Sequence, residues 1–212
     1  MVLLYTQPAV PVLIAISDGP PAPIEAVVLE IIDELPQALY VHVTPALLET
    51  LGQRYTVVDA SRHLKLALTR IDLVERYSIP VDVLAIDDLH EISAFYESAY
   101  PETWFDARML ATGRYVGVRA DAQLVCIAGV HVHSRAFGVA ALGNVATVPA
   151  LRGQGLARGV CAALCQLLLS DGIETIGLNV AADNAAALAS YAKLGFEQVT
   201  AYTEASLLAE EL

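Results

Sequence analysis

The sequence predicts a mixed α/β fold, in which a mostly antiparallel central sheet with flanking helices is preceded by a smaller α/β segment. Three apolar runs with strand-like alternation, at 114–119, 123–133 and 137–148, are separated only by turn residues, so these strands are expected to pair antiparallel. Stretches of helical periodicity at about 156–170 and 184–194 separate the later strands and predict helices packed on the sheet.

Residues 1–80 predict the smaller α/β segment. The apolar opening MVLLYTQPAVPVLIAI is interpreted as a buried strand, and the turn SDGPPAP at 17–23 separates it from a helix over 24–35. A strand at 39–43 precedes a helix that begins at Pro45, and the runs YTVVDA and HLKLALT then predict a pair of strands. Because the pattern restarts at VDVLAI, we place a domain boundary between residues 80 and 81.

Residues 81–212 predict the main domain. After the strand VDVLAI, Asp87 or Asp88 is a suitable N-cap for a helix that runs to about Ala99, and TWFDARMLA predicts a short helix. Gly172 and Gly195 follow the two later helices, where left-handed C-caps are expected. The strand ETIGLNV lies between these helices, and a last strand runs from 196 to about 203.

The composition excludes some classes of partner. The net charge of -12 would repel a nucleic acid backbone, and the basic residues form no cluster that could offset this. The apolar opening is too short, and too interrupted by proline, to span a membrane. Three cysteines without a framework spacing fit a reducing compartment, so we expect a cytoplasmic protein. A hydrophobic share of 56% is compatible with a homodimer.

The most informative stretch is LGNVATVPALRGQGLAR, where a strand runs into a glycine-bearing turn that opens a helix. Gly153 and Gly155 let the backbone approach a ligand closely, and the free amides and the helix dipole favour an anion such as pyrophosphate. The turn lacks a Gly-Lys-Ser/Thr ending, which excludes a phosphate-loop NTPase. The dinucleotide fingerprint fails because the spacing is G-x-G-x-x-x-G and the next strand ends without an acidic ribose ligand.

What remains resembles the GCN5-related N-acetyltransferase (GNAT) family, whose pyrophosphate loop reads Gln/Arg-x-x-Gly-x-Gly/Ala directly after a strand. The residues that match this loop are Arg152, Gly155 and Ala157. The residues that match the second signature of the family are Asn184, Ala187, Tyr191, Gly195 and Phe196. At about 100° per residue, the first three of these share one helix face. The resemblance covers roughly 81–203 and is nearest to the FR47-like and glycine N-acyltransferase-like domains.

The resemblance implies a GNAT-type fold and an acyl-CoA-dependent N-acyltransferase. Such an enzyme takes acetyl-CoA as the acyl donor, needs no metal, and passes the acetyl group directly to a primary amine on a small molecule or peptide. It implies that the parallel strands at 142–148 and 174–180 splay apart and hold the thioester between them. The residues it assigns to CoA binding are Val145, Ala146, Thr147, Arg152, Gly153, Gln154, Gly155, Leu156, Ala157, Arg158, Asn184 and Tyr191.

Tyr191 is the expected proton donor to the departing thiolate, and a strand amide near Ala146 or Thr147 is expected to bind the oxyanion. The general base comes from different places in this family. His131 ranks first because it shares a strand face with His133 and because imidazole titrates in the useful range. The other residues weighed for the acceptor side are Glu102 and Asp106 as bases, Tyr96, Tyr100 and Trp104 as pocket walls, and Asn144, which faces the splay but cannot act as a base.

Several of these residues also have a purely structural interpretation. Tyr191 could be a core aromatic and His131 a half-buried strand residue, while Cys161 and Cys165 fit small hydrophobes of a helix better than zinc ligands. A domain without a base would be a catalytically inactive acyl-CoA-binding sensor or regulatory module. Residues 1–80 match neither signature and, by analogy with tandem members of the family, are expected to be a degenerate or truncated GNAT-like half.

Overall fold

The computed structural model describes residues 2–17 and 22–209, so most of the turn predicted at 17–23 lies outside the described residues. The chain divides into two compact units. Unit 1 comprises Met1–Lys65, Val180–Asn184 and Gln198–Leu212, and unit 2 comprises Leu66–Asn179 and Ala185–Glu197. The strands β4 (Tyr55–Leu68), β9 (Thr175–Ala181) and β10 (Phe196–Ala209) contribute residues to both units. Neither unit is one continuous segment, and the boundary between residues 80 and 81 stays a prediction.

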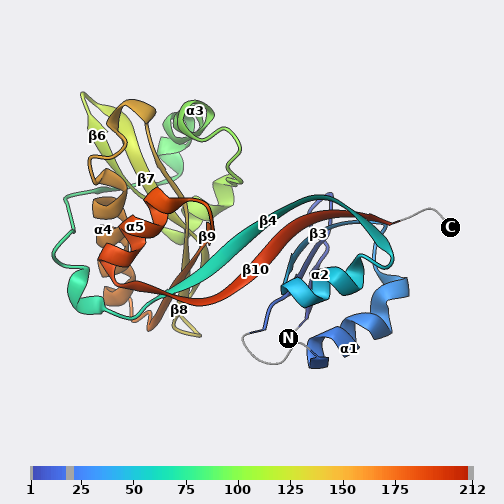
Figure 1. Ribbon diagram of the computed structural model, residues 1–212. Coiled ribbons are helices and arrows are strands. Elements are labelled where there is room, and N and C mark those ends of the chain that lie inside the picture. Colours follow the sequence, from blue (N-terminus) through green and yellow to red (C-terminus); the bar gives the residue numbers. More distant parts are fainter. Residues whose placement is uncertain (1, 18–21, 210–212) are drawn as a thin grey trace. The chain divides into compact units, whose positions relative to one another are not determined.

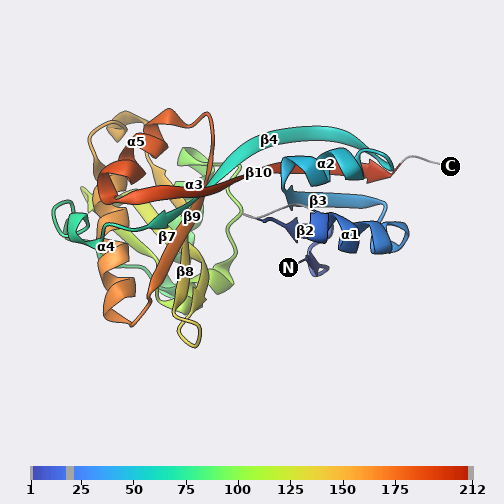
Figure 2. The same ribbon diagram turned by 60° about the horizontal axis from the view of Figure 1, so that its bottom comes forward.

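Unit 1 is built on a sheet with the strand order β1-β2-β3-β10-β4. The first three strands are β1 (Leu3–Tyr5), β2 (Val12–Ala15) and β3 (Ala38–Val43). β1 pairs antiparallel with β2, β2 pairs parallel with β3, and β3 pairs antiparallel with β10. The helices α1 (Ala22–Ile31) and α2 (Pro45–Leu51) pack against each other, as Figures 1 and 2 show, and η1 (Ile32–Glu34) continues from α1.

The alternation along β3 explains why one face of this sheet carries the core of unit 1. Leu39, Val41 and Val43 are buried, while Tyr40 and His42 between them point to the other face. The core also takes side chains from the neighbouring strands and from both helices. These side chains are Leu13, Ala15, Ile24, Val28, Leu47, Leu51, Ala205 and Leu207. The predicted strand at 39–43 and the helix from Pro45 are therefore confirmed.

Two predictions for the N-terminal segment are wrong. The apolar opening forms two antiparallel strands rather than one, because Pro8 and Pro11 fall between them and proline lacks the N–H that a ladder needs. The runs YTVVDA and HLKLALT form the single long strand β4 rather than a pair. Only Ser61 and Arg62 separate these runs, and neither residue forces the backbone to turn.

The other face of the unit 1 sheet carries a polar cluster around Glu204. Tyr40 and Tyr202 donate hydrogen bonds of 2.6 and 2.8 Å to its carboxylate. His42 Nδ1 lies 3.6 Å and His63 Nε2 3.8 Å from the same carboxylate. Burial alone would raise the pKa of Glu204, but the tyrosine hydroxyls and the histidines outweigh burial and hold the pKa below its ordinary value. Burial lowers the pKa of His42 against the opposing charge of Glu204.

Unit 2 contains a second run of strands in the order β9-β8-β7-β6-β5. They are β5 (Asp82–Val83), β6 (Val116–Ala120), β7 (Gln123–Ser134), β8 (Val139–Thr147) and β9 (Thr175–Ala181). The pairs β5–β6, β6–β7 and β7–β8 are antiparallel, and β8–β9 is parallel. The mixed, mostly antiparallel sheet expected from the sequence is confirmed.

Helices flank the unit 2 sheet (Figure 1). α3 (Leu89–Ala99) contacts β7 and β8, α4 (Leu156–Ser170) contacts β6, β7 and β8, and α5 (Ala185–Leu194) packs on α4. The 3-10 helices of this unit are η2 (Ile71–Leu73), η3 (Ile86–Asp88), η4 (Ala107–Thr112) and η5 (Pro149–Leu151). Gly172 and Gly195 have φ angles of 83° and 92°, which confirms the predicted left-handed C-caps. Within the described residues, no helix is long and apolar enough to cross a membrane.

The two parallel strands of unit 2 separate partway along their length. Their pairing begins at Val139–Thr175 and ends at Leu142–Leu178. β8 continues to Thr147 and stays paired with β7 on its other side. The splay expected between 142–148 and 174–180 is therefore present, and it leaves one backbone edge of β8 without a β9 partner.

Glu204→Gln is expected to lower the free energy of unfolding by about 1–3 kcal/mol at pH 7, because a buried tyrosine hydroxyl loses its ionised acceptor. The depressed pKa means that Glu204 stabilises the fold above an unfolded pKa of about 4.3, and that this contribution is lost as the pH falls through the folded pKa. Half-buried His42, whose pKa burial lowers, adds a loss that begins as the pH falls below about 6.5.

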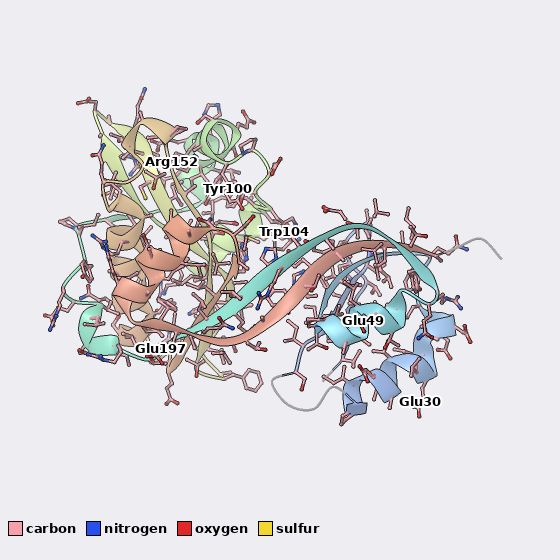
Figure 3. All side chains as sticks on the ribbon, in the orientation of Figure 1. Glu30, Glu49, Tyr100, Trp104, Arg152 and Glu197 are labelled. Atoms are coloured by element: carbon pink, nitrogen blue, oxygen red, sulfur yellow. The ribbon has the colours of Figure 1, made fainter. Side chains whose placement is uncertain are left out.

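Denaturant unfolding at a series of pH values between neutral and acid measures both effects. The matched control is Glu49→Gln on α2, where the glutamate is exposed (Figure 3). Equal stability of Glu204→Gln and the unmodified protein across the series would contradict the role given to this cluster.

Candidate active site

The glycine turn after β8 brings backbone amides close to the surface. The chain passes from Thr147 through η5 into the turn, and α4 begins at Leu156. Gly153 and Gly155 have φ angles of 76° and 83°, a left-handed conformation that side chains disfavour. The first backbone hydrogen bond of α4 joins Gly159 N to Gly155 O over 3.0 Å. The amides that precede Gly159 therefore have no partner inside the helix.

The turn is open rather than sealed by packed side chains. A Cβ built on Gly153 would meet no atom within 4 Å, and the residues from Arg152 to Gln154 are exposed. The dipole of the 15-residue helix α4 points its positive end at this spot. The turn and first helical residues predicted to bind pyrophosphate therefore lie together at a helix N-terminus, a kind of position that can bind an anion, and their contact with CoA stays a prediction. They are Gly153, Gln154, Gly155, Leu156, Ala157 and Arg158.

The two arginines of the turn make contacts within unit 2. Arg152 donates from Nε to Thr147 O over 3.1 Å and from Nη2 to Ala99 O over 3.0 Å. Figure 3 labels this residue. The Arg158 guanidinium carbon lies 4.5 Å from the centroid of the Tyr77 ring, a cation–π distance. Arg152 thus ties the turn to the end of β8 and to the end of α3, and its contact with CoA stays a prediction.

The end of β8 presents the strand residues expected to face the pantetheine arm. Ala146 and Thr147 pair with β7 on one side, and they lie beyond the last β8–β9 pair on the other. Both residues are buried, whereas Val145 is partly exposed. A backbone edge without a neighbouring strand can accept an extended ligand as an added strand. The structure supplies this edge, and the contacts of Val145, Ala146 and Thr147 with CoA stay predictions.

Tyr191 lies on α5 beside α4. Its ring centroid is 5.8 Å from that of Phe196, with the rings edge to face. Burial raises the pKa of Tyr191 far above its ordinary value, and the neighbouring thiols of Cys161 and Cys165 add to the increase. The phenol therefore stays protonated at physiological pH, as a proton donor must. Asn184 precedes α5 and belongs to unit 1, and its contact with CoA stays a prediction.

Two irregularities in β7 and β8 bring His131 and Asn144 together. The register between the strands shifts at His131, between the pairs Val130–Leu142 and Val132–Ala141. It shifts again around Asn144, between the pairs Gly129–Gly143 and Ile127–Ala146, and Asn144 has a φ of 54°. β-Bulges re-aim side chains in this way beside active sites. His131 Nε2 and Asn144 Oδ1 are 2.7 Å apart.

Asn144, which sequence analysis set aside because an amide is not a base, is the centre of a hydrogen-bond network. Its Nδ2 donates to Trp104 O over 3.1 Å and to Tyr115 Oη over 2.9 Å. Its Oδ1 accepts from Thr103 Oγ1 over 3.0 Å, and its main-chain oxygen accepts from Tyr96 Oη over 2.8 Å. Only 6% of Asn144 is exposed. The available sequence signal was one amide among the mostly apolar residues of the strand 139–147.

The aromatic residues predicted to line an acceptor pocket separate into two kinds. Tyr100 and Trp104 are exposed, at 44% and 63%, on the segment that follows α3 (Figure 3). The Trp104 ring meets the His131 ring edge to face at 5.9 Å. Tyr96 is buried at 4% exposure and uses its hydroxyl for Asn144. Between α3 and this segment lies a hollow of about 270 Å³. It is lined by Ser93, Tyr96, Glu97, Pro101, Thr103 and Phe105.

Asp106, His133 and the two helix cysteines fit a catalytic role less well than His131. The hydrogen bond from Arg108 lowers the pKa of Asp106 to about 2, so this carboxylate is a weak base at neutral pH. Within the described structure, His133 Nε2 is buried without a hydrogen-bond partner. Burial raises the pKa of Cys165 to about 12 and that of Cys161 well above its ordinary value. Residues 2–17 and 22–209 contain no group of three or more His, Cys, Asp or Glu arranged to hold a metal ion.

Comparison with curated proteins finds mycothiol acetyltransferases. The chain is 34% identical to that of Saccharomonospora viridis over 135 residues, which are 59% of this chain and 43% of the relative. It is 34% identical to that of Renibacterium salmoninarum over 110 residues, which are 50% of this chain and 31% of the relative. The matches thus span less than half of the length of these relatives.

Comparison with solved structures shows the fold. A Drosophila protein superposes with a TM-score of 0.75 at 16% identity and covers 98% of this chain and 73% of its own. A GCN5-related N-acetyltransferase from Kribbella flavida superposes with a TM-score of 0.58 at 19% identity, covering 95% of this chain and 82% of its own.

Residues 83–196 match the family described as Acetyltransferase (GNAT) family. This segment is more than half of the 212 residues, and it contains the glycine turn, the splayed strands and Tyr191. The chain therefore belongs to the GNAT acetyltransferase family.

Proposed function

We propose that the protein is an N-acetyltransferase that moves an acetyl group from acetyl-CoA to a primary amine by direct attack in a ternary complex. The observation that carries this proposal is the open turn at Gly153, which lies directly after the unpaired edge of β8. A pyrophosphate at the helix terminus and an extended arm along β8 would need both features side by side. Family membership and the curated acetyltransferase relatives support the same reaction.

The chain supplies groups for each proton transfer. The neutral amine attacks the thioester carbonyl carbon, a C–N bond forms and the C–S bond breaks. His131 accepts the proton that the amine loses, and Tyr191 gives a proton to the leaving thiolate. A strand amide near Ala146 or Thr147 binds the carbonyl oxygen as its charge grows. Acetyl-CoA supplies the activated acetyl group, and this chemistry involves no metal.

The acceptor is a small molecule or a peptide. The curated relatives are named for mycothiol acetylation, so mycothiol-related amines belong in the first panel of acceptors. Trp104 is exposed and contacts the His131 ring, and Tyr100 is exposed on the same segment after α3, so both offer aromatic surface to such an amine. All three cysteines are free and buried, which supports a reducing cytoplasmic compartment. We also propose a homodimer, on the basis of the apolar composition alone.

Purified protein with acetyl-CoA and a panel of amines is expected to release CoA thiol and to form an acetylated amine. Thiol release is followed with a disulfide reagent, and the product is identified by mass spectrometry. Binding of CoA by calorimetry without turnover on any amine would instead support a catalytically inactive acyl-CoA sensor. Absence of CoA binding at millimolar concentration would contradict both.

Tyr191→Phe is expected to reduce kcat by about 10²-fold, because the thiolate loses its proton donor while the ring keeps its contact with Phe196. The affinity for CoA should change little. Because the pKa of Tyr191 is raised, the unmodified enzyme should show no loss of activity from this group as the pH rises to 9. Tyr77→Phe, which keeps the ring under Arg158, is the matched control. A kcat of Tyr191→Phe equal to that of the unmodified enzyme would contradict the proposed role of Tyr191 as proton donor.

Gly153→Ala is expected to weaken CoA binding at least about tenfold, because the new methyl group projects into the open space over the turn. The left-handed backbone at this position also makes the substitution cost about 1–2 kcal/mol of stability. Gly172→Ala is a close control, since Gly172 has a φ of 83° and open space around it, but lies beyond the other end of α4. Calorimetry with CoA should therefore separate two variants of similar stability, and equal affinities would argue against the turn as the binding site.

A further inference from the structure

The hydrogen bonds around Asn144 fix which way its amide points. Trp104 O and Tyr115 Oη lie 3.1 and 2.9 Å from one end of the amide. A main-chain carbonyl only accepts, so the group that faces Trp104 O must be the Nδ2 donor. The opposite end is therefore the carbonyl oxygen Oδ1. Thr103 Oγ1 lies 3.0 Å from this oxygen and can donate to it.

The orientation of the amide determines the protonation of its other neighbour. His131 Nε2 lies 2.7 Å from Asn144 Oδ1. An amide oxygen cannot donate, so the hydrogen of this short contact must be on Nε2. A neutral imidazole carries one N–H, which leaves the lone pair on Nδ1. Within the described structure Nδ1 has no hydrogen-bond partner, and His131 is exposed.

The backbone conformation around Asn144 holds this contact in place. Asn144 adopts a φ of 54°, which asparagine tolerates better than most residues. A Cβ built on Gly143 would overlap the His131 ring, so the imidazole lies against bare backbone. A Cβ built on Gly129, the strand partner of Gly143, would overlap the Tyr115 ring. Two facing glycines thus make room for both rings that bond the Asn144 side chain.

We propose that Asn144 is a positioning residue that holds His131 with Nε2 protonated, so that Nδ1 is the atom that accepts the proton of the acceptor amine. The inference rests on the proposed function, because it assigns an atom to the base of that reaction. Asn144 touches neither substrate in this scheme and acts through His131. It also links the base to the acceptor side, because Thr103 and Trp104 bond the same amide and belong to the segment after α3.

Asn144→Asp separates positioning from a merely structural role. Aspartate tolerates the left-handed backbone as asparagine does and still accepts the hydrogen on His131 Nε2, while it loses the Nδ2 donor that faces Trp104 O. Its negative charge additionally favours the protonated imidazole. We expect the acidic limb of the kcat/KM profile to move by about one pH unit or more toward higher pH. Activity that falls equally at every pH, with the limb unmoved, would overturn the inference.

His90→Asn is the matched control, because His90 is an exposed histidine on α3 outside this network. Its acidic limb is expected to coincide with that of the unmodified enzyme. A limb that moves in His90→Asn as it does in Asn144→Asp would overturn the assignment of the limb to His131.

The protonation of His131 can be measured without any turnover. In protein labelled with nitrogen-15, long-range proton–nitrogen spectra of the neutral His131 ring are expected to show Nε2 protonated and Nδ1 unprotonated. The Nε2 proton should exchange slowly because it is held by a buried oxygen, and His131→Asn identifies the signals by their loss. A proton found on Nδ1 would overturn the inference even if acetylation were demonstrated. Failure to acetylate any amine would overturn the proposed function while this spectrum still reports on Asn144 and His131.

Discussion

β8 separates from β9 after the pair Leu142–Leu178, and the proposed site is built around this separation. Buried backbone N–H and C=O groups need partners, and a strand edge inside a sheet usually finds them on the next strand. Beyond Leu142, β8 lacks that neighbour, while Arg152 donates to the last carbonyl of the strand at Thr147. The site is therefore an interrupted ladder whose missing partner is expected to be an extended ligand, and the glycine turn follows at the position where an anionic end of that ligand would fall.

The other edge of the same strand, which pairs with β7, positions the residues that we assign to the acceptor half of the proposed site. β8 is paired with β7 along its length, and the two register shifts turn His131 and Asn144 toward each other. The contact also depends on two glycines. Because Gly129 and Gly143 have no side chain, they leave the space that the Tyr115 and His131 rings occupy. One strand thus faces the proposed donor with its backbone and the proposed acceptor with its side chains.

The parts of the molecule that sequence reasoning predicted are those with local chemical causes. Gly153 and Gly155 predict a tight turn, because only glycine adopts the left-handed backbone conformation freely. Both residues have positive φ angles. The long β4 was missed because two strand-like runs joined by Ser61 and Arg62 look the same whether the chain turns or continues. The role of Asn144 was not predicted, because strand alternation predicts which face of the sheet each residue lies on but does not predict a register shift. A bulge depends on how two strands pair with each other, and the sequence of one strand alone does not contain that information.

The identity of the group beside His131 also has a chemical consequence. A carboxylate there would stabilise the protonated imidazole and so reduce the fraction of free base at neutral pH. An amide accepts the same hydrogen without a net charge, so it fixes the ring while leaving the lone pair on Nδ1 available. The chain has 24 acidic residues, yet the position that the network fixes most firmly is occupied by an amide. For a base that must start each turnover unprotonated, a neutral partner therefore leaves a larger fraction of the imidazole free at neutral pH than a carboxylate would.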